Sequence, residues 1–260
     1  MTRVALITGG GQGIGAAVAR AFLQNGFRAC VLVDRNADAL MTMQADLGGD
    51  KVAILPADLI HVETANAAVD LALKTFGRVD VLVNAAGTSE RASIDAVTPD
   101  AFERLFGINV RAPTFLMQAA AKAMRQAGSG VIINVASMLS YGGPPDIGIY
   151  AGTKAALVAL TKNAANAWKR EGIRVFGINL GWVNSDGEHR LQTTFHNMPE
   201  NWAEVMGKRM PFGRLIAPAD VAGLCLFLVS PPAQMMTGAI IDYEQMPVGT
   251  YDTHPAVAPA

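Results

Sequence analysis

The sequence predicts one α/β domain built on a doubly wound sheet of seven parallel strands, with helices on both faces. Short runs rich in β-branched residues alternate with longer helical patterns along all 260 residues, which is typical of repeated strand–helix–strand units. Most of the strand-like runs are apolar without alternation, as expected of parallel strands that are covered on both faces. Because no linker or repeat interrupts this pattern, we expect a single domain over residues 1–260.

The predicted strands come in chain order at 4–8, 29–34, 51–55, 79–84, 130–135, 174–179 and 239–242. Helical patterns lie between them, for example at 14–24, 62–76, 99–126, 150–170 and 219–228. Doubly wound sheets bind ligands beyond the carboxyl ends of their strands, where the winding reverses. The motifs below follow predicted strands, so we expect them to meet at that edge.

Composition and charge favour a small-molecule partner. The chain is 51% hydrophobic and 17% charged, and its formal net charge is -1. Because Lys and Arg are scattered without a basic block, we expect neither nucleic acid nor an anionic membrane as a partner. Cys30 and Cys225 lie in apolar runs without metal-ligand spacing, so we interpret them as reduced core residues and expect no metal site.

The hydropathy of the chain predicts a cytoplasmic protein. The apolar run in the opening "MTRVALITGG" is too short for the core of a signal peptide, and glycines follow it at once. No run of 18 apolar residues occurs elsewhere, so we expect no membrane span.

The first predicted strand runs directly into "TGGGQGIG", residues 8–15, ahead of an apolar helix. Glycines there allow a tight turn and a close approach to a pyrophosphate, whose negative charge the amides at the helix start would face. Two registers fit, namely Gly9, Gly13 and Gly15, or Gly11, Gly13 and Ala16. The alternative is a glycine-rich turn without a ligand. We expect cofactor contacts from Gly9, Gln12, Gly13, Ile14 and Gly15.

Asp34 closes the second predicted strand, 21 positions after Gly13. An acidic residue there accepts hydrogen bonds from the adenosine ribose of NAD and repels the 2′-phosphate of NADP. Arg35 follows and would instead attract that phosphate, so NAD is the expected cofactor and NADP the alternative. Asp58 and Leu59 follow the third strand and would serve the adenine, although an aspartate in a loop is more often a helix cap.

The fourth predicted strand ends in "NAAG", residues 84–87. Small residues let the chain pass close to a bound ring or ribose, and a plain strand-to-loop turn is the alternative. The residues that we expect to contact the cofactor here are Asn84, Ala85, Ala86 and Gly87.

Further motifs follow in order: Asn109 in "GINVRAP", Ser137 in "INVAS", "YAGTK" at 150–154, "INLGWV" and "PFGRLIAPADVAGLCLFLVS". Together with the glycine loop, Asp34, "DL" at 58–59 and "NAAG", they cover nearly the whole chain. In this order and spacing the sequence resembles the short-chain dehydrogenases/reductases of the TGxxxGxG, YxxxK type, and is similar to bacterial sugar and polyol dehydrogenases. The resemblance implies a Rossmann-like fold and hydride transfer between a nicotinamide cofactor and an alcohol.

The resemblance also implies catalytic roles. Tyr150 would act as the acid/base, and Lys154 would hold the nicotinamide ribose and lower the pKa of the tyrosine. Ser137 would hydrogen-bond the substrate oxygen, and Asn109 would anchor a water leading to Lys154. Positions four apart share a helix face, so Lys154 can lie beneath Tyr150. Lowering a phenol pKa from about 10 to about 7 requires roughly 4 kcal/mol.

Each catalytic candidate also has a purely structural interpretation. Lys154 would then be a solvated helix residue, Ser137 a strand-end cap, and Asn109 a polar residue in a long helix. Their shared order and context favour the catalytic interpretation.

The sequence departs from the family pattern at three places. Leu180 and Gly181 stand where relatives usually have Pro-Gly, and Ser185 replaces a threonine that usually binds the carboxamide. "DYEQ" at 242–245 replaces a common "DGG", and the tail 246–260 either lines a substrate pocket or frays. After the sixth strand we expect cofactor contacts from Gly181, Val183 and Ser185.

The stretch 185–212 is the longest that does not fit the alternating strand and helix pattern of the domain. We expect it to form a lid over the nicotinamide. Its polar and aromatic groups favour a sugar or polyol over a steroid or acyl chain; these groups are Asp186, Glu188, His189, Arg190, His196, Asn197 and Trp202. We expect Met138, Trp182 and His189 to line the substrate pocket, with a solvated lid position as the alternative for His189.

The expected function is oxidation of a secondary or hemiacetal hydroxyl of a sugar or polyol with NAD. An NADPH-dependent ketone reductase and a catalytically silent NAD-sensing protein are the alternatives, and the presence of both Tyr150 and Lys154 weakens the second. Relatives are commonly tetramers built through the two long helices that hold Asn109 and Tyr150. Both helices are apolar enough here to predict a homotetramer.

Overall fold

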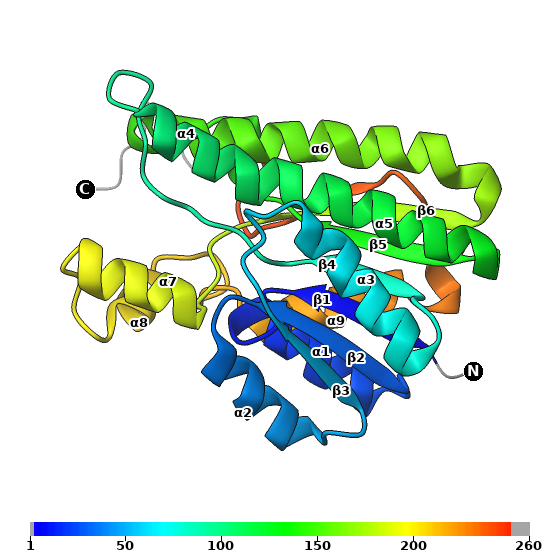
Figure 1. Cartoon of the computed structure of the whole chain (residues 1–260). Helices are drawn as coiled ribbons and strands as arrows, with labels where there is room; N and C mark the ends of the chain where they lie inside the picture. The colour runs from blue at the N-terminus through cyan, green and yellow to red at the C-terminus, as the bar shows by residue number, and fades with distance from the viewer. Residues whose placement is uncertain (1–2, 251–260) are drawn as a thin grey trace, which may run out of the picture.

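The computed structural model describes residues 3–250 and shows a parallel sheet with helices on both faces (Figure 1). Seven strands pair in the order β3-β2-β1-β4-β5-β6-β7, and each neighbouring pair is parallel. The direction of winding reverses between β1 and β4, so the predicted doubly wound fold is confirmed. The strands are β1 Val4–Thr8, β2 Ala29–Asp34, β3 Val52–Pro56, β4 Val81–Asn84, β5 Gly130–Val135, β6 Ile173–Leu180 and β7 Ile240–Tyr243.

Two layers of helices enclose the sheet. One face is covered by α1 Gly13–Gln24, α2 Ala37–Leu47 and α9 Pro218–Leu228. The opposite face is covered by α3 Glu63–Phe76, α5 Ala112–Ala127 and α6 Gly148–Trp168. The shorter helices are α4 Pro99–Phe106, which leads into α5, and α7 Asp186–Arg190 and α8 Trp202–Gly207, which lie in the stretch expected to form a lid.

The core lies on both sides of the sheet because successive side chains of a strand point to opposite faces. In β1, Ala5 and Ile7 pack toward α1, α2 and α9, whereas Val4 and Leu6 pack toward α3, α5 and α6. All five residues of this strand are buried. Two apolar faces explain why the central strands read as continuous hydrophobic runs in the sequence.

The helix predicted over 99–126 is interrupted in the structure. A π-helical turn, Gly107–Arg111, separates α4 from α5 and contains Asn109. The amide of Asn109 is held by the backbone of Thr88, because its Oδ1 accepts from the Thr88 N–H at 2.9 Å and its Nδ2 donates to the Thr88 carbonyl at 2.8 Å. Single π-helical turns of this kind are frequent at functional sites. Hydrophobic periodicity does not resolve such an inserted turn.

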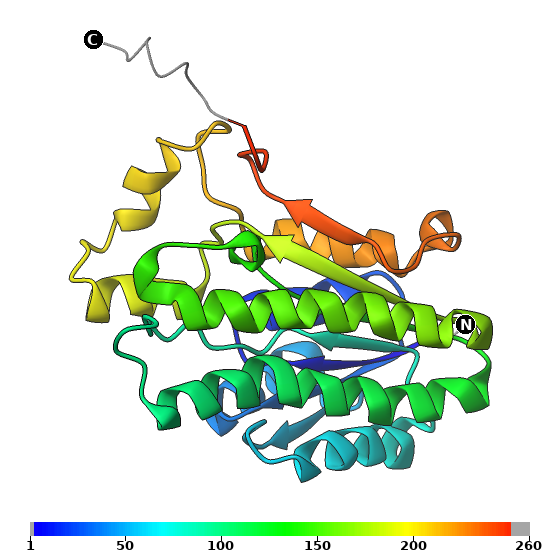
Figure 2. The ribbon, with the colours of Figure 1, turned by 90° about the horizontal axis from the view of Figure 1, so that it is seen from above.

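The strands all point toward the end of the molecule that carries α7 and α8 (Figure 2). In the same view α5 and α6 run side by side across one face of the sheet. The segments that follow β1, β4, β5 and β6 therefore meet at one edge, which is the place where the sequence motifs were expected to meet.

Candidate active site

The loop between β1 and α1 depends on glycine at two positions. Gly9 has a φ of 67°, and a Cβ there would lie 3.0 Å from the backbone of Ala86. A Cβ on Gly15 would lie 2.2 Å from the carbonyl oxygen of Gly9, so no side chain fits there. The side chain of Gln12 does not cap α1, which leaves backbone amides at the helix start, the arrangement that binds phosphate.

Asp34 is tied to this loop at the end of β2. Its Oδ2 accepts a hydrogen bond from the N–H of Gly11 at 3.1 Å, and its Oδ1 accepts from the N–H of Asn36 at 3.0 Å. Arg35 is exposed. Asp58 accepts from the N–H of Ile60 at 2.9 Å, which is the local turn-stabilising contact expected of a capping aspartate. The acidic group at the end of the second strand therefore lies beside the glycine loop.

Asn84 occupies a different environment from the one that a cofactor-binding side chain would need. It is buried, and its Nδ2 donates to Oδ1 of Asn134 at 2.8 Å. Asn134 in turn donates to Oγ1 of Thr161 at 2.9 Å, so the amide pair connects β4, β5 and α6. The side chain of Asn84 therefore stabilises the sheet, and Ala85, Ala86 and Gly87 are the parts of "NAAG" that lie nearer the surface.

Gly87 brings the end of β4 against the predicted catalytic residues. A Cβ on Gly87 would lie 3.3 Å from Oδ1 of Asn109 and 3.5 Å from Nζ of Lys154. Asn109 is buried and also donates from Nδ2 to Oγ1 of Thr153 at 3.1 Å. The structure thus brings Asn109 and Lys154 together at the carboxyl edge of the sheet, in a space that any larger residue at position 87 would narrow.

Ser137 and Tyr150 complete this group. Ser137 follows β5, is buried, and accepts a hydrogen bond from the N–H of Leu139 at 3.2 Å. Its side chain also lies near the hydroxyl of Tyr150, whose pKa it lowers; Tyr150 lies in the first turn of α6. Lys154 is one turn further along α6, and its Nζ lies 5.6 Å from the centre of the Tyr150 ring. Ser137 therefore caps the 3₁₀ turn that follows β5, and the same side chain lies where the catalytic interpretation requires it.

Burial is the largest influence on the pKa values of Lys154 and Tyr150. It lowers the pKa of Lys154 to about 8, and Nζ donates to the carbonyl oxygen of Val135 at 2.8 Å. Burial also raises the pKa of Tyr150 to about 12; the nearby side chain of Ser137 opposes this shift, and the negative charge of Glu188 adds to it. The direction is opposite to the lowering expected from Lys154, because desolvation of the phenolate outweighs the favourable protein contacts.

The lid is organised around two stacked tryptophans. Trp202 of α8 is fully buried, and its ring centre lies 5.5 Å from that of Trp182. Trp202 donates from Nε1 to Nδ1 of His189 at 3.2 Å, and Nε2 of His189 lies 3.0 Å from Oε2 of Glu200. Both ring nitrogens of His189 are thus engaged within the lid, although this residue was expected to contact substrate.

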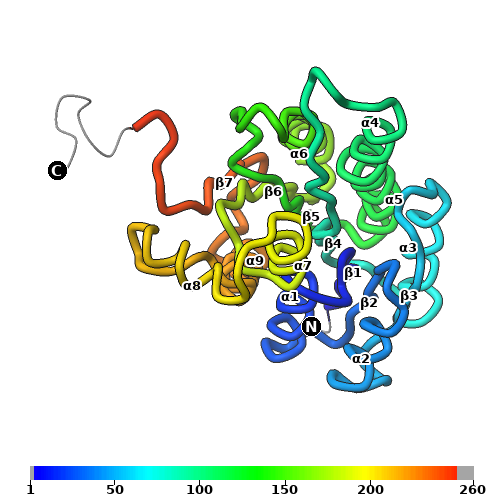
Figure 3. The backbone as a smooth tube through the Cα atoms, turned by 90° about the vertical axis from the view of Figure 1, so that its left-hand side faces the viewer, coloured from blue at the N-terminus to red at the C-terminus, as the bar shows by residue number. Residues whose placement is uncertain are grey.

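The lid also contacts the glycine loop (Figure 3, which looks onto this end of the molecule). The N–H of Gly13 donates to Oδ2 of Asp186 at 3.2 Å, and Arg190 donates to Oε1 of Gln12 at 2.8 Å. Both lid residues lie on α7. We call these two contacts the lid clasp; they link the segment expected to cover the nicotinamide to the loop expected to hold the pyrophosphate.

Two carboxylates outside the predicted site residues, Glu188 of the lid and Glu244, lie at this end of the site. Glu188 accepts hydrogen bonds from Nε1 of Trp182 and from Nε2 of Gln192, each at 2.8 Å. The carboxylate of Glu244 packs against Gly181, where a Cβ would lie 1.9 Å from Oε2. Glu244 belongs to the "DYEQ" departure, which was the available signal for it.

The remaining predicted residues lie along the same edge. Ser185 caps α7, with its Oγ accepting from the N–H of Glu188 at 3.3 Å. Val183 is buried and forms an isolated bridge with Ile216. Met138 begins the 3₁₀ turn after Ser137 and is half-buried. Of the tail, residues 251–260 lie outside the described part of the chain.

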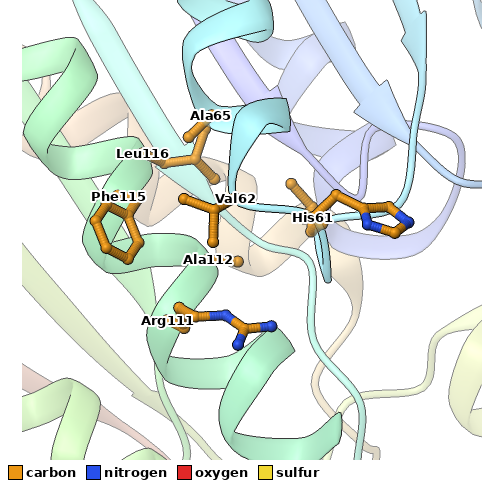
Figure 4. A pocket seen from close by; sticks show the side chains of 8 residues that line it. His61, Val62, Ala65, Arg111, Ala112, Phe115 and Leu116 are labelled. Atoms are coloured by element: carbon orange, nitrogen blue, oxygen red, sulfur yellow. The ribbon is translucent and has the colours of Figure 1, made fainter.

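A separate small hollow lies between α3 and α5 (Figure 4). Leu59 contributes to it, as does Arg111, whose guanidinium donates to the carbonyl oxygen of Ile60 at 2.9 Å. The other lining residues are His61, Val62, Ala65, Ala112, Phe115 and Leu116. None of the four predicted catalytic residues lines this hollow.

Within residues 3–250, no helix is both long and apolar enough to cross a membrane. The same residues contain no group of three or more His, Cys, Asp or Glu side chains placed to hold a metal ion.

A family model described as "Enoyl-(Acyl carrier protein) reductase" matches residues 9–244. The chain belongs to the short-chain dehydrogenase/reductase family. The resemblance inferred from the sequence motifs is thereby confirmed. A short-chain dehydrogenase/reductase is an oxidoreductase with a nicotinamide cofactor, and the glycine loop, too crowded for side chains at Gly9 and Gly15, fits a dinucleotide phosphate.

Characterised relatives of this short-chain dehydrogenase/reductase include enzymes named for polyols. Sorbitol dehydrogenase of Cereibacter sphaeroides is 36% identical over 238 residues, which cover 89% of this chain and 91% of that enzyme. Galactitol 2-dehydrogenase of Agrobacterium fabrum is 35% identical over 237 residues, covering 88% of this chain and 90% of that enzyme.

Solved structures of the family carry either form of the cofactor. A 3-ketoacyl-(acyl-carrier-protein) reductase from Brucella melitensis, complexed with NADH, is 33% identical with a TM-score of 0.81, covering 92% of this chain and 96% of that one. An actinorhodin polyketide ketoreductase with NADPH is 26% identical with a TM-score of 0.87, covering 94% and 96%.

The lid clasp predicts a measurable change in lid motion. Replacing Asp186 and Arg190 together with Ala should speed backbone amide exchange in residues 186–195, because the lid loses both contacts with the glycine loop. Hydrogen exchange followed by mass spectrometry measures this directly. The matched control is Glu204→Ala, which removes an ion pair within α8 and leaves the clasp intact. Unchanged exchange in the double variant would show that the clasp does not restrain the lid.

Proposed function

We propose that the protein is an NAD-dependent dehydrogenase that oxidises a secondary or hemiacetal hydroxyl of a sugar or polyol. The observation that carries this proposal is the grouping of Ser137 and Tyr150 beside the buried ammonium of Lys154, with the side chain of Ser137 close enough to lower the pKa of the phenol. The polar and aromatic side chains of the lid support a hydroxylated substrate, and the relatives named for sorbitol and galactitol support the same class.

Each chemical role falls to a residue of this chain. Ser137 would hold the substrate oxygen through its hydroxyl, and Tyr150 would take the hydroxyl proton at its Oη. Lys154, fixed by the carbonyl of Val135, would keep a positive charge near the phenol at pH values below its pKa of about 8. An oxidised nicotinamide, when bound, supplies the hydride acceptor and a further positive charge.

The ionisation of Tyr150 determines how the rates of oxidation and reduction change with pH. Burial and Glu188 raise the pKa of Tyr150 to about 12, so the protein groups by themselves keep the hydroxyl protonated at neutral pH. Oxidation requires the phenolate and therefore rises with pH as Tyr150 loses its proton. Reduction of a ketone requires the protonated phenol and falls over the same range.

Asp34 supports NAD as the preferred cofactor. Its carboxylate lies against the glycine loop, where it would accept hydrogen bonds from the ribose hydroxyls and repel a 2′-phosphate. Arg35, exposed beside it, is the feature that favours NADP and with it the alternative function of ketone reduction.

A homotetramer and a cytoplasmic location remain predictions. The helices expected to form the tetramer interface, α5 and α6, lie side by side on one face of the sheet, and Phe115 of α5 is 36% exposed there.

Removing the Tyr150 hydroxyl tests the proposed chemistry. Tyr150→Phe should lower kcat for oxidation of polyols by about 10²–10⁴-fold, the range usual for loss of a general acid/base group. Binding of NADH, followed by its fluorescence, should stay intact in the variant. Turnover within tenfold of the unaltered protein would remove Tyr150 from the mechanism. A protein that binds NAD tightly and oxidises no sugar or polyol would instead favour the sensing function.

Replacing Asp34 tests the choice of cofactor. Asp34→Ala should weaken NAD binding by about tenfold, because a charge-assisted hydrogen bond is worth roughly 1.5–3 kcal/mol. It should leave NADP binding unchanged or strengthen it, because the repulsion of the 2′-phosphate is lost. The control is Asp38→Ala, which removes an acidic side chain from the first turn of α2. Affinities for both cofactors are measured by calorimetry. A preference for NADP in the unaltered protein would favour the ketone reductase.

A further inference from the structure

The carboxylate of Glu188 is fixed at one of its two oxygens. Oε1 accepts from Nε1 of Trp182 and from Nε2 of the buried Gln192, both at 2.8 Å. The backbone N–H of Glu188 donates to Ser185, which caps the same helix. Two donors on one oxygen orient the carboxylate, and Oε2 accepts no hydrogen bond from the described residues.

The carboxylate of Glu188 has no cationic partner within the described part of the chain. Among residues 3–250, no Lys, Arg or His forms an ion pair with it. The neighbouring lid residues are engaged elsewhere, His189 with Glu200 and Arg190 with Gln12. The carboxylate is hydrogen-bonded to Trp182, two residues beyond the end of β6, so it lies at the carboxyl edge of the sheet where Ser137 follows β5. From there its negative charge raises the pKa of Tyr150.

An ionised carboxylate has a clear chemical preference among substrates. It accepts hydrogen bonds and donates none, so it suits hydroxyl groups and repels a second anion. Partial burial of a carboxylate without a cationic partner also costs free energy, because the charge loses contact with water. Hydrogen bonds from a bound ligand would offset that cost. A polyol offers several adjacent hydroxyl donors, whereas a sugar acid brings a like charge.

We propose that Glu188 determines substrate specificity, with Oε2 accepting hydrogen bonds from hydroxyl groups of a neutral polyhydroxylated substrate and the charge excluding its anionic counterparts. This assignment rests on the proposed function and deepens it. It divides the substrate class in two, since neutral sugars and polyols are accepted and sugar acids are rejected.

The test is Glu188→Gln, measured on a neutral and an anionic six-carbon substrate, sorbitol and gluconate. Glutamine keeps an Oε1 that accepts from both Trp182 and Gln192, so the lid contacts survive while the charge is lost. The ratio of kcat/KM for sorbitol over gluconate should fall at least tenfold. The pH profile of oxidation should also move to lower pH, because the carboxylate no longer raises the pKa of Tyr150.

Two further variants separate charge from packing. Glu204→Gln removes an exposed lid carboxylate that pairs with Lys208, and the substrate ratio should stay as in the unaltered protein. Gln192→Leu removes one hydrogen-bond donor to Oε1 and keeps the carboxylate charge, so the ratio should again stay within about threefold. A tenfold loss of the ratio in Gln192→Leu would show that lid packing sets the selectivity, which overturns the assignment.

The remaining outcomes distinguish this assignment from the proposed function. If the unaltered protein oxidises sorbitol and Glu188→Gln keeps both the ratio and the pH profile, the role of Glu188 is wrong and the proposed function stands. If the unaltered protein oxidises no sugar, polyol or sugar acid, the substrate class fails and the assignment fails with it.

Discussion

The buried ammonium group of Lys154 is the interaction on which the site depends. A charge in the protein interior needs a partner, and here Nζ donates to the carbonyl oxygen of Val135 at the end of β5. That contact ties α6 to the carboxyl edge of the sheet and holds the cation beside Tyr150. Desolvation lowers the pKa of Lys154 to about 8, so its charge is retained at neutral pH and lost as the pH rises through that value.

The parallel sheet places the residues that surround the ammonium group of Lys154. Parallel strands end at the same edge, and β4 and β5 deliver Gly87 and Ser137 to it side by side. A buried amide pair, Asn84 with Asn134, connects the two strands, and Asn134 continues to Thr161 on α6. The scaffold therefore fixes the residues predicted to be catalytic, while Trp182 and the lid residue Glu188 lie on the segment that follows β6.

Sequence patterns predicted the parts of the molecule that depend on local chemistry. The strands were predicted to within about two residues because they are short, apolar and bounded by turns, and the spacing of Tyr150 and Lys154 placed both on one helix face. The sequence did not predict the buried contact between Asn84 and Asn134 or the π-helical turn at Asn109. It also did not predict the contacts of Glu188 and Glu244. Each depends on a partner distant in the sequence or on the path of the lid, which residue periodicity does not encode. The burial of Tyr150, which raises its pKa in the protein without cofactor, was not predicted for the same reason, because burial is a tertiary property.

The ionisation of Tyr150 provides the most direct measurement of the link between Lys154 and catalysis. Carbon-13 NMR of labelled tyrosine, assigned with a Tyr150→Phe variant, reports the pH at which this phenol loses its proton in NAD-saturated protein. We expect that pH to lie well below the value of about 12 set by the protein groups, and to rise by about one unit or more in Lys154→Met, since a nearby opposite charge shifts a pKa by roughly that amount. An equal ionisation pH in both proteins would contradict a role for the ammonium group in activating the phenol.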